Sequence, residues 1–449
     1  MTASQPVTGN TNERSLVRAM GVWGLAAGIV NVTVGGGIFR LPAAAAGSLG
    51  PAAPLAYILC AVAMGLIVLC FAEAGSRVSL TGGLYAYVEV AFGPLIGFLV
   101  GVMLWAGITL ATSAIASFFG DALGGLIPSL AGGVARIITL AVILLGFGAL
   151  NIAGVRGANR FNAGMTVAKL LPLAVLLIVG VFAVHAENLH WKDTPGTGEV
   201  ARASAVLIFA FLGIESALVP SGEVIDPART VPRSIGVAMV GITVLYLAVQ
   251  MVAQGILGPD LAQQKTPLAE AAAVAIGAPG RWLILIGSIV SMFGYIGAMV
   301  LAGPRLLFAL GRDGFLPPQL ARVHARFRTP HVAIALHVVA VFVLAATGTF
   351  EKLGIIANGS ILLVYAACCA AVLELRRRHI QTDRPPFQPP FGILIPVLAF
   401  AVIAWILSSL TAGEWKAVGI VFVAAIVLYF ATMPSRRAAR SVPATETLA

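Results

Sequence analysis

Apolar stretches long enough to cross a lipid bilayer recur along the whole sequence. A helix needs about 20 consecutive, mostly apolar residues to cross a hydrocarbon core of roughly 30 Å. Hydrophobic residues make up 59% of the 449 residues and charged residues only 10%, which excludes a water-soluble globular protein. The pattern predicts about twelve transmembrane helices, at residues 16–46, 52–75, 85–117, 133–153, 161–185, 200–222, 234–257, 281–310, 331–348, 353–375, 391–410 and 415–433.

We therefore expect an all-α polytopic membrane protein with one membrane domain at residues 16–433, between short cytoplasmic tails at residues 1–15 and 434–449. The net charge of +10 does not indicate nucleic acid binding, because the basic residues lie in short loops with no polar domain around them. With both termini in the cytoplasm, nineteen Lys and Arg residues fall inside and eight outside. Insertion prefers this distribution, so we expect a multi-pass protein of the cell membrane whose surroundings are the lipid bilayer.

The cysteines offer neither a metal site nor a disulfide. Cys60, Cys70, Cys368 and Cys369 fall in apolar spans without metal-ligand spacing and without a loop partner. We interpret them as small core residues and expect no metal or cofactor. The first span runs past the length of a cleavable apolar core, so no removable signal peptide is expected.

Three consecutive glycines, Gly35, Gly36 and Gly37, fall in the middle of the first predicted span. Each disfavours a helix by about 1 kcal/mol relative to alanine. A helix opened there exposes N–H and C=O groups that lipid cannot satisfy but a polar ligand in a protein cavity can. The alternative is close helix packing through small residues, a pattern that Gly24 and Gly28 fit well.

A second interruption is predicted five spans later. Gly213 and the ionisable Glu215 lie near the middle of the otherwise apolar residues 205–217. Corresponding interruptions in two halves of a transporter indicate an inverted repeat with a binding site at the membrane midplane. Glu215 is interpreted either as a group that acts on the substrate or as a carboxylate that merely holds the break open.

Lys169 lies about eight residues inside the fifth span, too deep for its ammonium to reach the interface easily. A charge at this depth costs at least a few kcal/mol unless it is paired or functional. We hypothesise that the ammonium fills the place of a bound Na⁺ and ties span 5 to the opened carbonyls of span 1, which would permit proton coupling. The alternative is a fixed structural cation.

The residues around these features resemble amino acid permeases of the amino acid–polyamine–organocation (APC) superfamily. The resemblance covers most of the chain. Its motifs are Gly35-Gly36-Gly37-Ile38-Phe39 with Pro42, Phe209 to Glu215, Phe71-Ala72-Glu73 leading to Gly82-Gly83-Leu84-Tyr85-Ala86-Tyr87, Gly222 to Arg233, and Phe308 to Pro317.

This resemblance implies a leucine-transporter-like fold, in which spans 1–5 and 6–10 form inverted repeats, helices 1 and 6 are discontinuous and spans 11 and 12 are additional. It implies that N–H groups of Gly35, Gly36 and Gly37 bind the substrate carboxylate. Carbonyls of Thr33, Phe209, Ala210 and Leu212 would bind the amino group, and the Phe209 ring would gate the site.

Lys169 matches the span 5 lysine that occupies a sodium-like position in such proteins. The resemblance therefore implies sodium-independent exchange or proton coupling. The sequence departs from the family at Gly36, where serine is usual, and at Ser79, where proline is common. The glycine at position 36 removes one hydroxyl contact to the carboxylate. The serine at position 79 bears on the assignment of an inner gate.

The side chains expected around the substrate carry no charge. They come from spans 3, 8 and 10: Trp105, Thr109, Thr112, Ser113, Met292, Phe293, Tyr295, Asn358 and Ser360. The sequence therefore predicts a secondary transporter of neutral amino acids, with a cationic amino acid or polyamine antiporter as the alternative if Glu215 is the counter-ion.

Two other function classes fit the sequence less well. A channel or a transporter-derived nutrient sensor would need a continuous polar pore helix or a long cytoplasmic domain, and the sequence has neither. A membrane enzyme would need a polar constellation such as paired histidines, a phosphate loop or a GxSxG elbow, so we expect no enzyme. No cysteine is placed for the disulfide to a partner subunit that some relatives use.

Overall fold

The computed structural model describes residues 21–78, 83–153, 158–191, 194–214, 227–381 and 385–432. Within these ranges the chain is helical and contains no strand. The helices are α1 (Val22–Thr33), α2 (Leu41–Leu49), α3 (Ala53–Arg77), α4 (Leu84–Phe92), α5 (Pro94–Leu126), α6 (Gly133–Ala153), α7 (Ala158–Gly180), α8 (Thr197–Leu207), α9 (Pro227–Leu257), α10 (Pro267–Ile276), α11 (Ala278–Arg312), α12 (His331–Thr347), α13 (Phe350–Arg377), α14 (Leu394–Ser408) and α15 (Ala412–Ala431).

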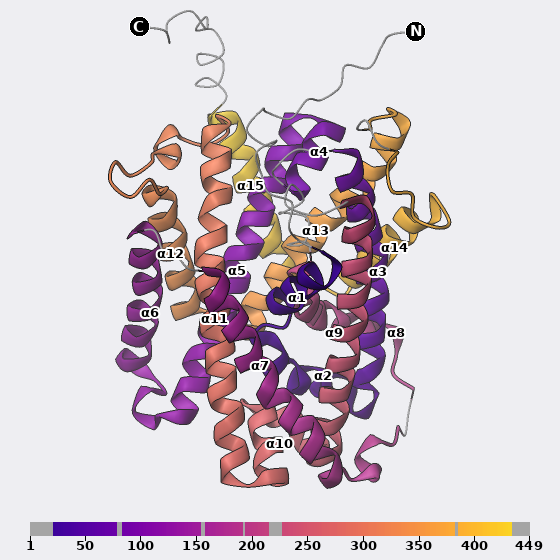
Figure 1. The fold of residues 1–449 in the computed structure, drawn as a ribbon, viewed down its shortest axis with the longest axis vertical. Helices are drawn as coiled ribbons and strands as arrows, with labels where there is room; N and C mark the ends of the chain where they lie inside the picture. The colour runs from indigo at the N-terminus through magenta and orange to yellow at the C-terminus, as the bar shows by residue number, and fades with distance from the viewer. Residues whose placement is uncertain are drawn as a thin grey trace, which may run out of the picture.

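Seven helical segments among the described residues are long and apolar enough to cross a membrane. Shorter apolar helices, such as α12 and α14, accompany them in the same bundle (Figure 1). The expectation of an all-helical membrane protein is thereby confirmed at this level.

The helices divide into a core and a lipid-facing periphery. In the most apolar stretch of α5 and of α13, 72% of the residues are buried, against 17% for α6 and 11% for α15. Large apolar side chains such as Val142 on α6 and Ile420 on α15 stay exposed. In a bilayer these surfaces meet hydrocarbon, so α6 and α15 face lipid while α5 and α13 organise the interior. Figure 1 shows α6 at one edge of the bundle.

The predicted third span is wrong at its start. A single helix was expected from residue 85, but the chain forms α4 and then α5, separated at Gly93. Gly93 has a φ of 86°, a left-handed conformation that glycine adopts without strain, and Pro94 then starts the new helix. The short helix α10, between the predicted spans 7 and 8, was also not expected.

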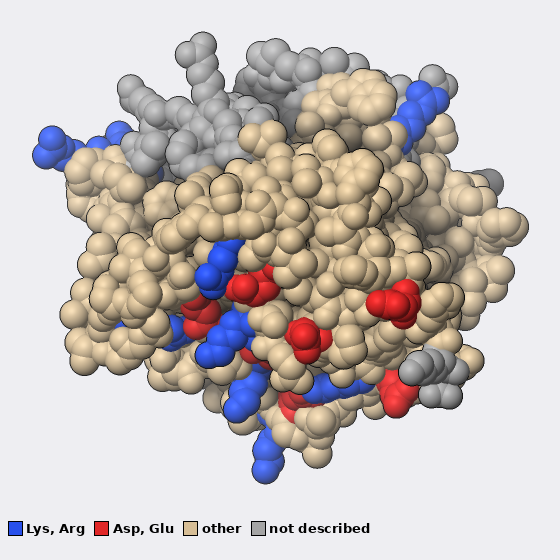
Figure 2. Space-filling model, turned by 90° about the horizontal axis from the view of Figure 1, so that it is seen from below, with Lys and Arg blue, Asp and Glu red and all other residues tan. Residues whose placement is uncertain are grey.

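Charged side chains gather at the end of the bundle where α10 lies. Figure 2 looks at that end and shows basic and acidic side chains interleaved on an otherwise uncharged surface. Arg40 Nη2 lies 2.6 Å from Glu351 Oε1, and Arg281 Nη2 lies 3.0 Å from Glu270 Oε1. These partly exposed pairs join neighbouring helix ends and contribute little stability each.

A buried ion-pair network lies where α3 and α13 end. The fully buried Glu73 carboxylate accepts from Arg77 Nε at 3.0 Å and from Arg376 Nε at 2.7 Å. Arg77 belongs to α3 and Arg376 to α13, so one carboxylate holds the two helices together. Its removal would leave two guanidinium groups without their counter-charge.

We predict that Glu73→Ala destabilises the protein by about 3 kcal/mol. Breaking a buried pair costs roughly 3–5 kcal/mol, and the 23% exposure of Arg376 puts the effect at the lower end. Thermal unfolding in detergent micelles measures it. Glu374→Ala is the matched control, because its partner Arg377 is 76% exposed and water replaces the lost pair. Equal losses of unfolding temperature in the two variants would contradict the prediction.

Candidate functional site

The first helix is broken at the glycines. α1 ends at Thr33, Val34 leaves the helical region with a ψ of 76°, and a 3₁₀ turn, η2 (Gly36–Phe39), follows before α2 begins at Leu41. The Gly35 N–H donates to Thr33 O at 2.8 Å, a local turn that replaces the helical pattern. The first N–H groups of η2 have no intrahelical acceptor, as at the start of any helix.

The second break follows α8. A 3₁₀ turn, η7 (Ile208–Phe211), leads to Leu212 in an extended conformation and to Gly213 with a φ of 103°. A Cβ atom at Gly213 would lie 2.9 Å from Val32 Cγ1, so this break touches the first helix. Glu215 lies outside the residues that the structure describes, and its predicted role is not placed.

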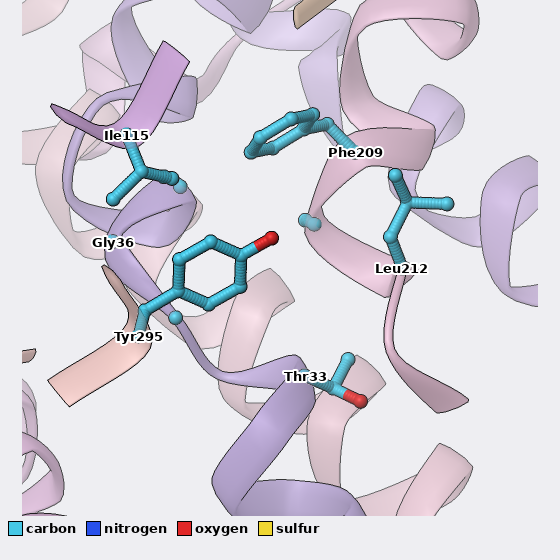
Figure 3. A pocket seen from close by; sticks show the side chains of 9 residues that line it. Thr33, Gly36, Ile115, Phe209, Leu212 and Tyr295 are labelled. Carbon is cyan, nitrogen blue, oxygen red and sulfur yellow. The ribbon is translucent and has the colours of Figure 1, made fainter. Parts of the chain in front are cut away.

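The two breaks face one small cavity. Its lining consists of Thr33, Gly35, Gly36, Gly37, Ile115, Phe209, Ala210, Leu212 and Tyr295. Figure 3 shows the Tyr295 hydroxyl pointing into the space between Thr33, Leu212 and Phe209. The cavity offers about 20 Å³ to the centre of a water molecule, which is room for one water. A larger ligand must therefore push side chains aside.

The Thr33 hydroxyl adds a polar group to this lining. Thr33 is 4% exposed, and its Oγ1 makes no hydrogen bond within the described part of the chain. A hydroxyl at the wall of a cavity can donate a hydrogen bond to a ligand or accept one from it.

The three glycines also pack closely against other helices. Added Cβ atoms at Gly35 and Gly37 would lie 3.3 Å from Tyr295 Cδ2 and 3.1 Å from Phe209 Cδ1. A Cβ atom at Gly36 would overlap Met292 Cγ. Close packing, the alternative considered for these glycines, thus coexists with an open backbone. It also accounts for the absence of serine at position 36, because Met292 fills the space.

Aromatic rings cover the cavity on one side. Phe209 makes an edge contact with Phe350, with ring centroids 5.5 Å apart, and Phe350 in turn lies 5.7 Å from Phe118. Glu351, next to Phe350, carries the ion pair with Arg40. The cavity is therefore separated from the α10 end of the bundle by a layer of rings followed by an ion pair.

Lys169 is buried, with 5% exposure, and its ammonium donates to the Asn31 carbonyl in the last turn of α1. The ammonium thus reaches the broken helix from α7, as the hypothesis of a span 5 to span 1 tie requires. Its part in coupling stays a prediction.

All seven residues expected to bind the substrate lie in the cavity lining, although binding itself stays a prediction. Of the expected side-chain pocket, Tyr295 lines the cavity and Met292 contacts Gly36 behind it. Other members of this set contact neighbouring helices instead. Thr109 Oγ1 lies 3.3 Å from His337 Nδ1, Ser113 donates to Val341 O, and Phe293 packs on Phe147. Asn358 donates to Ala205 O at 2.7 Å and to Val206 O at 3.2 Å.

Two residues of this region were not singled out from the sequence. Ile115 lines the cavity from α5, and the Tyr246 hydroxyl on α9 contacts carbonyls of both breaks. Ile115 is one apolar residue among many in its span, so the sequence carries no signal for it. The place of Tyr246 in the middle of an apolar span is a weak sequence signal for a functional role.

Known proteins that this chain is similar to are named as permeases, transporters or exchangers. The family model described as amino acid permease matches residues 20–435. A methylthioribose transporter of Bacillus subtilis is 29% identical over 95% of both chains. A branched-chain amino acid permease of the same organism is 28% identical over 90% of both chains, and its serine/threonine exchanger is 26% identical over 89% of this chain and 92% of its own.

We predict that Gly36→Ala destabilises the protein by about 1–3 kcal/mol, the usual cost of overpacking. The added methyl group overlaps Met292, and Met292→Ala removes that overlap. In a double-mutant cycle measured by thermal unfolding, the two changes together should therefore cost less than the sum of the single changes. Strict additivity would show that Met292 does not limit position 36.

Proposed function

This chain belongs to the amino acid permease family, and on that premise we propose that it moves neutral amino acids across the cell membrane by alternating access. The family consists of transporters and not of enzymes, so the chain is a multi-pass membrane transporter. The choice among amino acids, the mode of coupling and the detailed topology are the proposed parts.

The observation that carries the proposal is that two broken helices face one cavity. An α-amino acid is a zwitterion, so its site needs hydrogen-bond donors for the carboxylate and acceptors for the ammonium. The start of η2 supplies N–H groups at Gly36 and Gly37, where the dipole of the following helical segment favours an anion. Carbonyls of Thr33 and Ala210 supply acceptors. These are the residues expected from the family resemblance.

A neutral side chain on the substrate is favoured by the cavity wall. The nine lining residues that the structure describes carry no carboxylate, ammonium or guanidinium group. Ile115 and Phe209 offer apolar surface, and Tyr295 offers one hydroxyl. A cationic amino acid or polyamine would need a counter-charge such as Glu215.

Sodium-independent exchange or proton coupling is the proposed mode. The Lys169 ammonium bonds to Asn31 O and places a positive charge beside the first break. One relative is named as an exchanger, which favours exchange.

The leucine-transporter-like architecture with about twelve spans belongs to the same proposal. The two breaks fall in predicted spans 1 and 6, as an inverted repeat of spans 1–5 and 6–10 requires. Cytoplasmic N- and C-termini are proposed from the distribution of basic residues.

The test is uptake into proteoliposomes preloaded with unlabelled amino acids. We predict that neutral amino acids are taken up, that preloading accelerates uptake, and that replacing sodium by choline leaves the rate unchanged. Liposomes without protein are the control. Uptake of arginine or polyamines alone would overturn the neutral preference, and uptake that depends on sodium would overturn the coupling assignment.

Methylthioribose is the second candidate substrate, because the similarity to the methylthioribose transporter extends over 95% of both chains. A thiosugar carries neither a carboxylate nor an ammonium group. Competition by unlabelled methylthioribose against each labelled amino acid distinguishes the candidates. Uptake of methylthioribose with no response to any amino acid would replace the proposed substrate class.

We predict that Lys169→Ala lowers uptake about tenfold. The change leaves the Asn31 carbonyl without its buried donor, and a buried unsatisfied polar group costs about 1–3 kcal/mol. If Lys169 also carries the coupled proton, the residual uptake loses its pH dependence. The exposed Lys416→Ala is the control. Unchanged uptake with unchanged pH dependence would reject any role of Lys169 in coupling.

A further inference from the structure

Tyr246 joins the two broken helices through one hydroxyl group. It lies on α9 and is completely buried. Its oxygen is 2.8 Å from Ala210 O, in the second break, and 3.1 Å from Thr33 O, at the end of α1. Both residues line the cavity, and Figure 3 shows Thr33 at its edge.

The tyrosine ring cannot turn away easily. It makes edge contacts with Phe211, at a centroid distance of 5.4 Å and an interplanar angle of 74°, and with Tyr57, at 6.3 Å and 61°. In a close-packed interior such contacts hold the ring in one rotamer. The position of the hydroxyl is therefore fixed by packing and does not depend on a ligand.

The hydroxyl has one proton and faces two acceptors. The Thr33 carbonyl already accepts the Gly35 N–H at 2.8 Å, whereas Tyr246 is the donor on Ala210 O at the shorter of its two distances. A carbonyl oxygen has two lone pairs, so each keeps acceptor capacity after these bonds. Tyr246 therefore brings two acceptors from different helices together without saturating them.

We propose that Tyr246 is a positioning residue for the amino group of the substrate, an inference that rests on the proposed function. Its hydroxyl fixes the distance between the Thr33 and Ala210 carbonyls. Two converging carbonyl oxygens accept N–H donors and repel a carboxylate, so the pair selects the end of the substrate that carries the ammonium. Amino acids are then preferred over analogues of the same shape that lack the amino group.

The test compares Tyr246→Phe with Tyr57→Phe. Both changes delete one buried phenolic oxygen from the same aromatic cluster, but the Tyr57 hydroxyl has no hydrogen-bond partner within the described residues. For each protein, inhibition of amino acid uptake is measured with the unlabelled amino acid and with its des-amino carboxylic acid. The ratio of the two inhibition constants reports recognition of the amino group.

In Tyr246→Phe we expect the apparent affinity for the amino acid to fall about tenfold and that for the des-amino acid to change less than about twofold, the size of one lost hydrogen bond. The ratio should be unchanged in Tyr57→Phe. 4-Aminophenylalanine at position 246, which keeps an N–H donor, should restore the ratio. If the phenylalanine variant does not fold, 4-fluorophenylalanine at 246 gives the same contrast, since it fills the space but donates no proton.

Equal weakening of both inhibitors in Tyr246→Phe, or an unchanged ratio, would overturn the assignment, because a merely structural hydroxyl affects the two ligands alike. Failure of the proposed function is distinguished by the unaltered protein. If that protein binds and transports no amino acid, the substrate class is wrong. If it does so and the Tyr246 ratio does not move, only the role of Tyr246 is wrong.

Discussion

The structure depends on one constraint: hydrocarbon offers no hydrogen-bond partner to an open backbone. Every peptide group that leaves helical pairing inside the membrane must find a donor or acceptor within the protein or on a ligand. The chain opens its backbone between Thr33 and Leu41 and again after Leu207. Both openings are surrounded by helices, and the central helices α5 and α13 are the most buried of the long apolar helices. The open backbone groups therefore lie inside the protein and not against lipid, which could not form hydrogen bonds with them.

Long polar side chains from three other helices satisfy carbonyls near the breaks. Asn358 on α13 donates to the last turn of α8, the Tyr246 hydroxyl on α9 donates to Ala210 O and lies 3.1 Å from Thr33 O, and Lys169 on α7 donates to Asn31. These side chains supply donors to carbonyls near the breaks, and a carbonyl oxygen that accepts one hydrogen bond keeps a second lone pair for a ligand.

Much of this arrangement could be predicted from the sequence, because glycine and charge are conspicuous in an apolar helix. The glycine triplet located the first break, Gly213 with the ionisable Glu215 located the second, and the depth of Lys169 indicated a buried partner. The separation of α4 from α5 at Gly93 was missed, because a single glycine before a proline also occurs inside membrane-spanning helices. Ile115 and the contact between Gly36 and Met292 depend on how distant helices meet, which no local pattern encodes.

The contact between Gly36 and Met292 also limits how such a chain can change over time. A serine at position 36 requires a smaller residue at 292, and a smaller residue at 292 first leaves an empty space beside the glycine. Each substitution is disfavoured in the absence of the other. Descendants of this sequence therefore acquire a serine at position 36 at the lowest cost when position 292 changes together with it.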